Sequence, residues 1–153
     1  MSTWQDVATD APEFAERVRA VFAGGTNKTI ATLRADGSPR ISGTELEFQD
    51  GEVTLGMMAD ARKLRDVRRD PRVAVHSPTI EPPKDDPTAW PGDAKFAGRL
   101  VATDPPPDTP HVGAGFFRLD ITEVAMVRLG ETGDHLVIES WHPGRGYRRR
   151  TRL

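Results

Sequence analysis

Two adjacent cations, Arg62 and Lys63, follow Asp60 at the expected start of a short helix. The first turn of a helix offers unpaired backbone N–H groups and a partial positive charge, so cations there are unfavourable unless an anion is present. Arginine also supplies planar, bidentate donors that suit phosphate. The spacing therefore predicts a phosphate site. The residues alone leave an alternative open, a solvated basic face in which Arg62, Asp66 and Asp70 are i,i+4 neighbours.

Other chemistries find little support in the residue types. The chain has no cysteine, which excludes disulfides, thiolate zinc sites and thiol nucleophiles. Its four histidines never fall at the i,i+4 spacing of a helical metal pair, and we predict no metal site. No nucleophilic triad is visible, and Glu45 and Glu47 alternate on a strand in a way more typical of a solvated face. Catalytic residues are therefore unidentified.

An arginine-rich C-terminal tail, residues 142–153, is the strongest charge feature. Three interpretations compete: a disordered end, a clamp on a neighbouring subunit's cofactor, and a nucleic-acid patch. The disordered end is favoured, because termini fray unless they dock. Nucleic acid is disfavoured by the formal net charge of −2 and a pI near 6.1. The arginines concerned are Arg145, Arg148, Arg149, Arg150 and Arg152.

The elements that must position these residues begin with a helix that follows Asp10 and ends at Gly24 and Gly25. Asp10 and Glu13 have capping-box spacing, and the apolar stripe consists of Phe14, Val18, Val21 and Phe22. Residues 28–34, 40–48 and 53–57 alternate with period two and are separated by Asp-Gly turns at 36–37 and 50–51. This pattern predicts a three-stranded antiparallel meander.

The second half of the chain predicts a short helix and further strands. Asp60 is the expected cap of a helix over residues 61–69, which Asp70-Pro71 ends. Strands are expected at 72–76, 94–103, 116–129 and 136–141, and proline-rich loops at 77–93 and 104–110. With 153 residues, we expect one domain, 1–153, built as a small antiparallel barrel.

The order of these elements resembles the pyridoxamine 5′-phosphate oxidase-like split-barrel family. The most specific match is the segment 61–75, ARKLRDVRRDPRVAV, in which a basic helix leads into Asp-Pro-Arg-Val. A second match is the first hairpin, residues 32–40. The resemblance covers about residues 12–140. It implies a mainly β fold, a six-stranded antiparallel Greek-key split barrel.

The resemblance also implies a homodimer with a flavin or deazaflavin between its subunits. Its cofactor would be FMN, with the deazaflavin coenzyme F-420 as the alternative. Lys63 and Arg62 would meet the cofactor phosphate, and the ring would be lined by Arg40, Ser42, Thr44, Met57 and Met58. The sequence departs from the family pattern at Asp66, a position often occupied by Asn. A proline-rich connector, 105–110, also replaces a helix usually found between the later strands.

The function implied is a flavin- or deazaflavin-dependent oxidoreductase that transfers hydride to or from a small organic molecule. Cofactors of this kind carry the chemistry themselves, so the absence of a catalytic triad is compatible with the expectation. Two alternatives remain: a cofactor-binding protein without turnover, and a barrel that binds nucleic acid through its tail. No apolar run approaches the ~18 residues of a membrane helix, and no secretory signal is visible, so the expected location is the cytoplasm.

Overall fold

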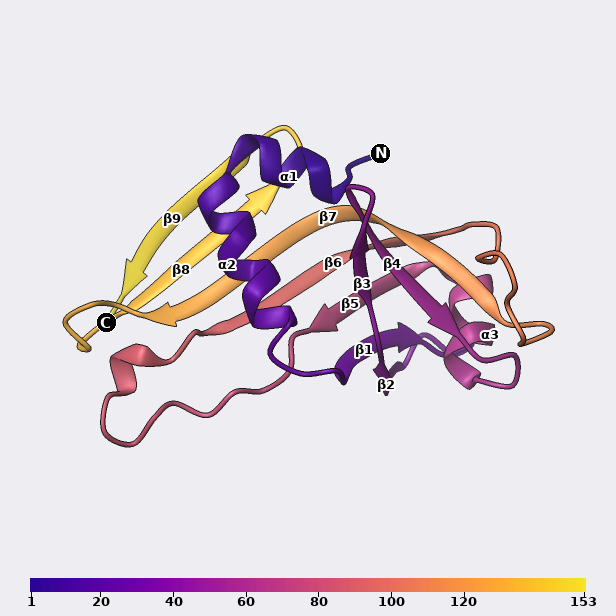
Figure 1. The fold of residues 1–153 in the computed structure, drawn as a ribbon, viewed down its shortest axis with the longest axis horizontal. Helices are drawn as coiled ribbons and strands as arrows, with labels where there is room; N and C mark the ends of the chain where they lie inside the picture. The colour runs from indigo at the N-terminus through magenta and orange to yellow at the C-terminus, as the bar shows by residue number, and fades with distance from the viewer.

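Nine β-strands form one antiparallel sheet in the computed structural model, which describes residues 1–153 (Figure 1). Three α-helices and one 3₁₀ turn, η1, Pro87–Ala89, complete the chain. The helices are α1, Trp4–Asp10, α2, Pro12–Phe22, and α3, Arg62–Arg69. The strands are β1, Lys28–Leu33, β2, Pro39–Thr44, β3, Glu47–Gln49, β4, Glu52–Met57, β5, Arg72–His76, β6, Asp93–Ala102, β7, Gly115–Leu129, β8, Leu136–His142, and β9, Gly146–Arg152.

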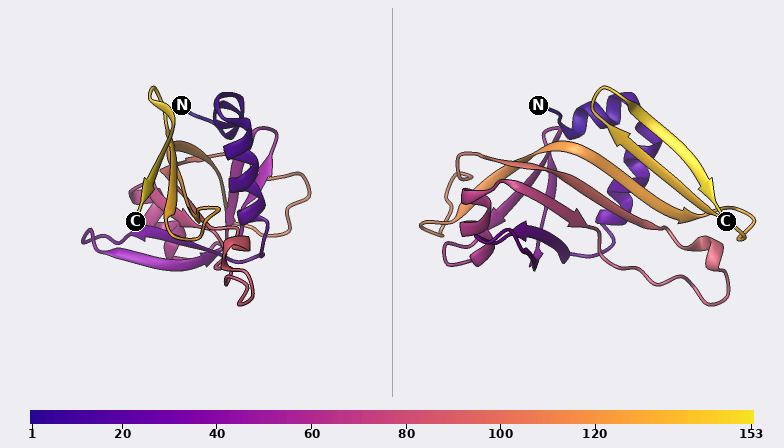
Figure 2. Two further views of the ribbon diagram at one scale, coloured as in Figure 1. Left: turned by 90° about the vertical axis from the view of Figure 1, so that its left-hand side faces the viewer. Right: turned by 180° about the vertical axis from the view of Figure 1, so that it is seen from behind.

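The two end strands of the sheet are neighbours in the chain, although no hydrogen-bonded ladder joins them. The hydrogen-bonded order is β2-β1-β5-β6-β7-β4-β3, and only residues 45 and 46 separate β2 from β3. The sheet must therefore curl, as the end-on view in Figure 2 shows. With β2 and β3 counted as one bent strand, six strands surround the barrel, which confirms the predicted mainly β split barrel. Its Greek-key arrangement stays a prediction.

The predicted meander is wrong at its centre. The two turns hold: β1 pairs with β2, and β3 pairs with β4, with positive φ at Gly37, Asp50 and Gly51. The expected continuous strand over 40–48, however, breaks between Thr44 and Glu47. Leu46 lies in this break and is buried in the core. The bend that places Leu46 inside sends the chain from one end of the sheet to the other.

The two N-terminal helices have other caps than the sequence suggested. A helix that was not predicted, α1, begins with a capping box in which Thr3 and Asp6 exchange hydrogen bonds. Asp10 ends this helix and accepts a hydrogen bond from the Trp141 indole at 3.0 Å, so it does not cap α2. The residue before α2 is Ala11, which offers no side-chain cap. The predicted helix and its buried stripe are confirmed in α2.

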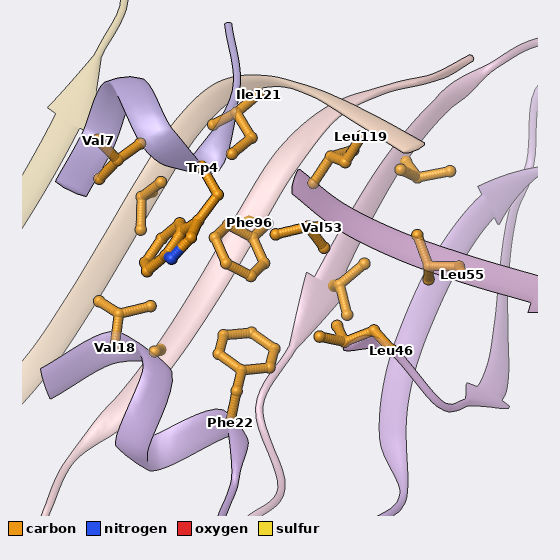
Figure 3. Close-up of a cluster of buried hydrophobic side chains, with 14 of the residues drawn as sticks. Trp4, Val7, Val18, Phe22, Leu46, Val53, Leu55, Phe96, Leu119 and Ile121 are labelled. Atoms are coloured by element: carbon orange, nitrogen blue, oxygen red, sulfur yellow. The ribbon is translucent and has the colours of Figure 1, made fainter. Parts of the chain in front are cut away.

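Both helices cover an opening of the curled sheet with aromatic side chains (Figure 3). Trp4 and Phe22 reach from α1 and α2 onto Phe96 of β6, with ring centroids 5.7 Å and 4.7 Å apart. Phe48 of β3 adds an edge contact to Trp4 at 4.9 Å. Such pairs add about 0.5–1.5 kcal/mol each beyond the burial of their area. The core therefore joins the N-terminal helices to both halves of the barrel.

The predicted disorder of the C-terminal tail is wrong, because residues 146–152 form β9 and pair with β8 along its whole length. A turn with positive φ at Gly144 and Gly146 reverses the chain. Tyr147 then packs against Phe14 of α2, with ring centroids 5.2 Å apart. This docking supplies the contacts that hold a terminus in place.

The long loop over residues 77–92 is confirmed as an irregular connection. It is closed by the Trp90 indole, which donates to the Ile80 carbonyl at 2.7 Å. The proline-rich connector before β7 is likewise without a helix. None of the helices is long and apolar enough to cross a membrane.

Candidate functional site

A cationic hollow of about 500 Å³ lies between α3 and the β1–β2 hairpin. Five arginine guanidiniums and two carboxylates surround it, and Ala35 is its one apolar residue. The hairpin and the helix meet here because Leu64 and Val67 of α3 are buried against the barrel, which leaves the arginine face of the helix toward the hairpin. The lining residues are Arg34, Ala35, Asp36, Arg40, Arg62, Arg65, Asp66 and Arg69.

Asp66 is the buried centre of the hollow. Its carboxylate accepts hydrogen bonds from Thr32 Oγ1 and Arg40 Nε, both at 2.7 Å, and from Arg69 at 3.0 Å. Burial alone would raise the pKa of Asp66, but these three donors outweigh it and hold the pKa below its ordinary value. Asp66 is therefore a fixed anion whose charge is neutralised by its ion pairs with Arg40 and Arg69.

The second carboxylate of the hollow is also engaged. Asp36 accepts from the Ser38 backbone N–H at 2.9 Å and from its hydroxyl at 2.6 Å, and these bonds lower the pKa of Asp36. Neither acid forms an ion pair with Arg34, Arg62 or Arg65. Three exposed guanidiniums thus face the hollow without an ion-pair partner.

The start of α3 adds to this positive character. Ala61 precedes the helix without a side-chain cap, so the predicted cap by Asp60 is wrong. No acidic residue stands in the first turn, although a carboxylate there would favour the helix dipole. The last turn carries Arg68 and Arg69, as expected for a helix C-terminus. The uncapped end and the cations of the first turn together suit an anionic ligand.

Of the two residues predicted to meet a phosphate, only Arg62 lines the hollow. The Lys63 ammonium instead donates to the Gly43 carbonyl of β2. This bond ties the start of α3 to the second strand, and partial burial lowers the pKa of Lys63. Lys63 therefore stands beside the hollow, over the strand that carries Ser42 and Thr44.

The five residues predicted to line a ring are dispersed. Arg40 reaches the hollow and is held by Asp66, and Ser42 is half-buried on the same face of β2. Thr44 is buried, and its hydroxyl donates to the Glu45 carbonyl at 3.1 Å. Met57, the last residue of β4, packs in the core, whereas Met58, which follows the strand, is 70% exposed.

Arg34, Arg65 and Arg69 were not among the predicted residues. A signal for two of them was present, because Arg62, Arg65 and Arg69 are spaced i,i+3 and i,i+7 and so share one helix face. Arg34 had no comparable signal. Its place beside this face depends on how the hairpin packs against α3, which is a tertiary contact.

Comparisons of sequence find no family model and no curated protein that match the chain. Comparisons of structure do find matches. One is a pyridoxamine 5′-phosphate oxidase-related, FMN-binding protein from Nostoc punctiforme, which is 12% identical and has a TM-score of 0.67. The match covers 97% of this chain and 99% of that protein.

Two further structures show the same fold. PhzG from Burkholderia lata, solved with tetrahydrophenazine-1-carboxylic acid, gives a TM-score of 0.62 at 11% identity, covering 94% of this chain and 87% of PhzG. A heme-binding protein from Mycobacterium smegmatis gives 0.55 at 15% identity, covering 89% and 86%. These likenesses, together with the strand order, confirm the predicted resemblance at the level of the fold. This chain has the split-barrel fold of the pyridoxamine 5′-phosphate oxidase-like proteins.

Proposed function

We propose that this protein binds a phosphorylated flavin, FMN, in the hollow beside α3 and acts as an oxidoreductase on a small organic molecule. The observation that carries the proposal is the convergence of Arg34, Arg62 and Arg65 on one hollow without an ion-pair partner. The deazaflavin F-420 carries a phosphodiester and is the alternative cofactor. The fold, shared with an FMN-binding protein from Nostoc punctiforme, supports this assignment.

The residues of the hollow fit a phosphate and not a flavin ring. Its lining is almost wholly charged, and a phosphate ester would receive bidentate hydrogen bonds from two or more guanidiniums. Asp66 keeps Arg40 and Arg69 in place and leaves the other three arginines free to bind the ligand. A planar aromatic ring, by contrast, needs apolar contacts, and Ala35 alone offers one here.

The ring would then lie outside the hollow, across the start of α3. Met58 stands there, because its carbonyl accepts from the Ala61 N–H at 3.0 Å, and its side chain is exposed. Ser42 lies on the neighbouring β2, which Lys63 joins to the helix. A bound flavin would supply hydride transfer, and the chain's own residues would hold the phosphate, orient the ring and exclude water.

A homodimer would complete this open site. Ile41 on the outer face of β2 is 74% exposed. It continues a cross-strand row of small apolar residues through Ala31, Ala74 and Ala97 on β1, β5 and β6. An exposed apolar row of this kind suits a second copy of the chain, which would cover the ring.

The proposal is tested by the absorbance and mass spectra of the purified protein and by titration of the cofactor-free chain. FMN should bind with quenching of its fluorescence, and F-420 is titrated in parallel. Arg62→Gln/Arg65→Gln should weaken binding at least tenfold, because each lost charge-assisted hydrogen bond costs about 1–3 kcal/mol. The charge-matched control is Arg68→Gln/Arg99→Gln, whose residues lie outside the hollow.

Equal weakening in the two double variants would contradict the phosphate assignment. A heme-like absorption band without flavin binding would contradict it as well. Turnover is tested separately, by oxidation of reduced FMN or F-420 in the presence of candidate acceptors. Binding without any turnover would favour the alternative of a non-catalytic cofactor-binding protein.

A further inference from the structure

A second cationic hollow, of about 670 Å³, lies on the outer face of β6, β7, β8 and β9. It shares no lining residue with the hollow beside α3. Figure 1 shows the β8–β9 hairpin and α3 at opposite ends of the long axis. The arginine-rich tail, which the proposed function does not use, forms one wall of this second hollow.

The strand register explains how the hollow forms. Lys95, Ala125, Ser140 and Arg148 make one continuous row across β6, β7, β8 and β9. The next row places Val127 and Ile138 beside Arg150, and directly paired residues share a face of the sheet. Small and apolar side chains on the two middle strands thus make a floor, and long cationic side chains stand on the strands at either side.

The cations of this hollow are nearly uncompensated. Arg145, Arg148 and Arg150 are exposed and form no ion pair within the chain. Glu123 is the one carboxylate of the lining, and it pairs with His142 at 2.9 Å. Asp93 begins the outer row on β6 but does not line the hollow.

On the opposite, inner face of the β8–β9 hairpin, the one carboxylate forms ion pairs within the chain. There the buried Glu139 binds Arg17 of α2 and Arg128 of β7. Glu139 is therefore paired within the chain, although Arg149, which lies directly opposite it on β9, forms no ion pair. On the outer face Arg148 and Arg150, roughly 7 Å apart along the strand, have only Ser140 and Ile138 opposite them. The outer arginines are left for an external anion.

We propose that this second hollow binds a small organic anion with an apolar body and two acidic groups. Three strand spacings separate Lys95 from Arg148, roughly 14 Å between their Cα atoms. A lone phosphate would reach one wall only, whereas a rigid molecule with an acid at each end would reach both. Its body would lie on Ala125, Val127 and Ile138, within a volume usual for small-molecule sites.

The test uses naphthalene-2,6-dicarboxylate as the probe and isothermal titration calorimetry of the full chain in low salt. Binding should be saturable with one site per chain. 2-Naphthoate, which lacks the second acid, and citrate, which lacks the apolar body, should each bind at least tenfold more weakly. Equal affinity for the dicarboxylate and either of these two compounds would overturn the proposal.

Variants locate the site. Arg148→Gln/Arg150→Gln should weaken dicarboxylate binding at least tenfold, and Arg68→Gln/Arg99→Gln, which removes the same charge elsewhere, should change it less than twofold. Equal losses would mean that overall charge attracts the probe, and the site would be rejected. The FMN affinity of Arg148→Gln/Arg150→Gln should stay within twofold of the unmodified protein. A tenfold loss of FMN would make this hollow part of the flavin site and overturn its assignment as a separate one.

Discussion

The carboxylate of Asp66 on α3 accepts a hydrogen bond of 2.7 Å from the guanidinium of Arg40 on β2. The hydroxyl of Thr32 on β1, 34 positions earlier in the chain, donates a second hydrogen bond of 2.7 Å to the same carboxylate. Asp66 therefore fastens the helix to both strands of the first hairpin. It also shapes the candidate phosphate site, since it holds two of the five arginines around the hollow.

Replacement of Asp66 by alanine should lower the free energy of unfolding by about 2–4 kcal/mol, because it leaves Thr32 and the mostly buried Arg40 without their acceptor. Asp66→Asn, which keeps one carbonyl acceptor, should cost less. Urea denaturation measures both. Asp85→Ala in the exposed loop is the control and should stay within about 0.5 kcal/mol of the unmodified protein.

Stability should fall in acid. Burial opposes the ionisation of Asp66, but its hydrogen bonds together outweigh burial and lower its folded-state pKa. Hydrogen bonds from Arg72 lower the pKa of Asp70 to about 2. A depressed folded-state pKa contributes stability above the unfolded value of 3.8, and that stability is lost as the pH falls through the folded value.

The melting temperature, followed from pH 6 to pH 2, should therefore drop below about pH 4. Asp66→Ala should show a shallower drop over the same interval, because it lacks one of the responsible groups. Parallel curves for the two proteins would show that Asp66 does not contribute to the acid response.

Gly98 on β6 lies at the irregularity in the pairing of β6 with β7. A Cβ there would stand 2.2 Å from the Asp120 carbonyl oxygen, which is backbone and cannot move aside as a side chain would. Gly98→Ala should therefore destabilise the protein by about 1–3 kcal/mol. The matched control is Gly43→Ala on β2, where a Cβ meets nothing within 4 Å. A thermal melt of the two variants that gave the same loss would refute the steric argument.

Tyr147 is the side chain through which β9 docks on α2. Tyr147→Ala should lower the free energy of unfolding by about 1–2 kcal/mol, through loss of the aromatic pair with Phe14 and of the area it buries. Faster amide hydrogen exchange in residues 146–152 should accompany this loss. Arg150→Ala on the exposed face of the same strand should leave both measurements nearly unchanged.

Local patterns in the sequence determined most of the elements. The Asp-Gly turns, the period-two strands and the stripe of α2 are recorded in neighbouring residues, because a turn needs particular φ values and an amphipathic element needs a particular spacing. The same spacing places Arg62, Arg65 and Arg69 on one face of α3. The sequence thus indicated the basic character of the candidate phosphate site and the order of helices and strands along the chain that resembles the split barrel.

Tertiary structure decided which polar groups meet. The sequence predicts that Asp10 caps a helix. In the structure its carboxylate instead accepts a hydrogen bond from Trp141, more than a hundred residues later in the chain. The sequence predicts a disordered tail, but Tyr147 packs against Phe14 and holds the tail in place. The sequence also predicts a continuous strand over 40–48, which is interrupted where Leu46 is buried. Arg40 and Asp66 likewise meet only when α3 packs on the hairpin. Such partners are set by long-range packing, which determines where each local element must bend, end or dock.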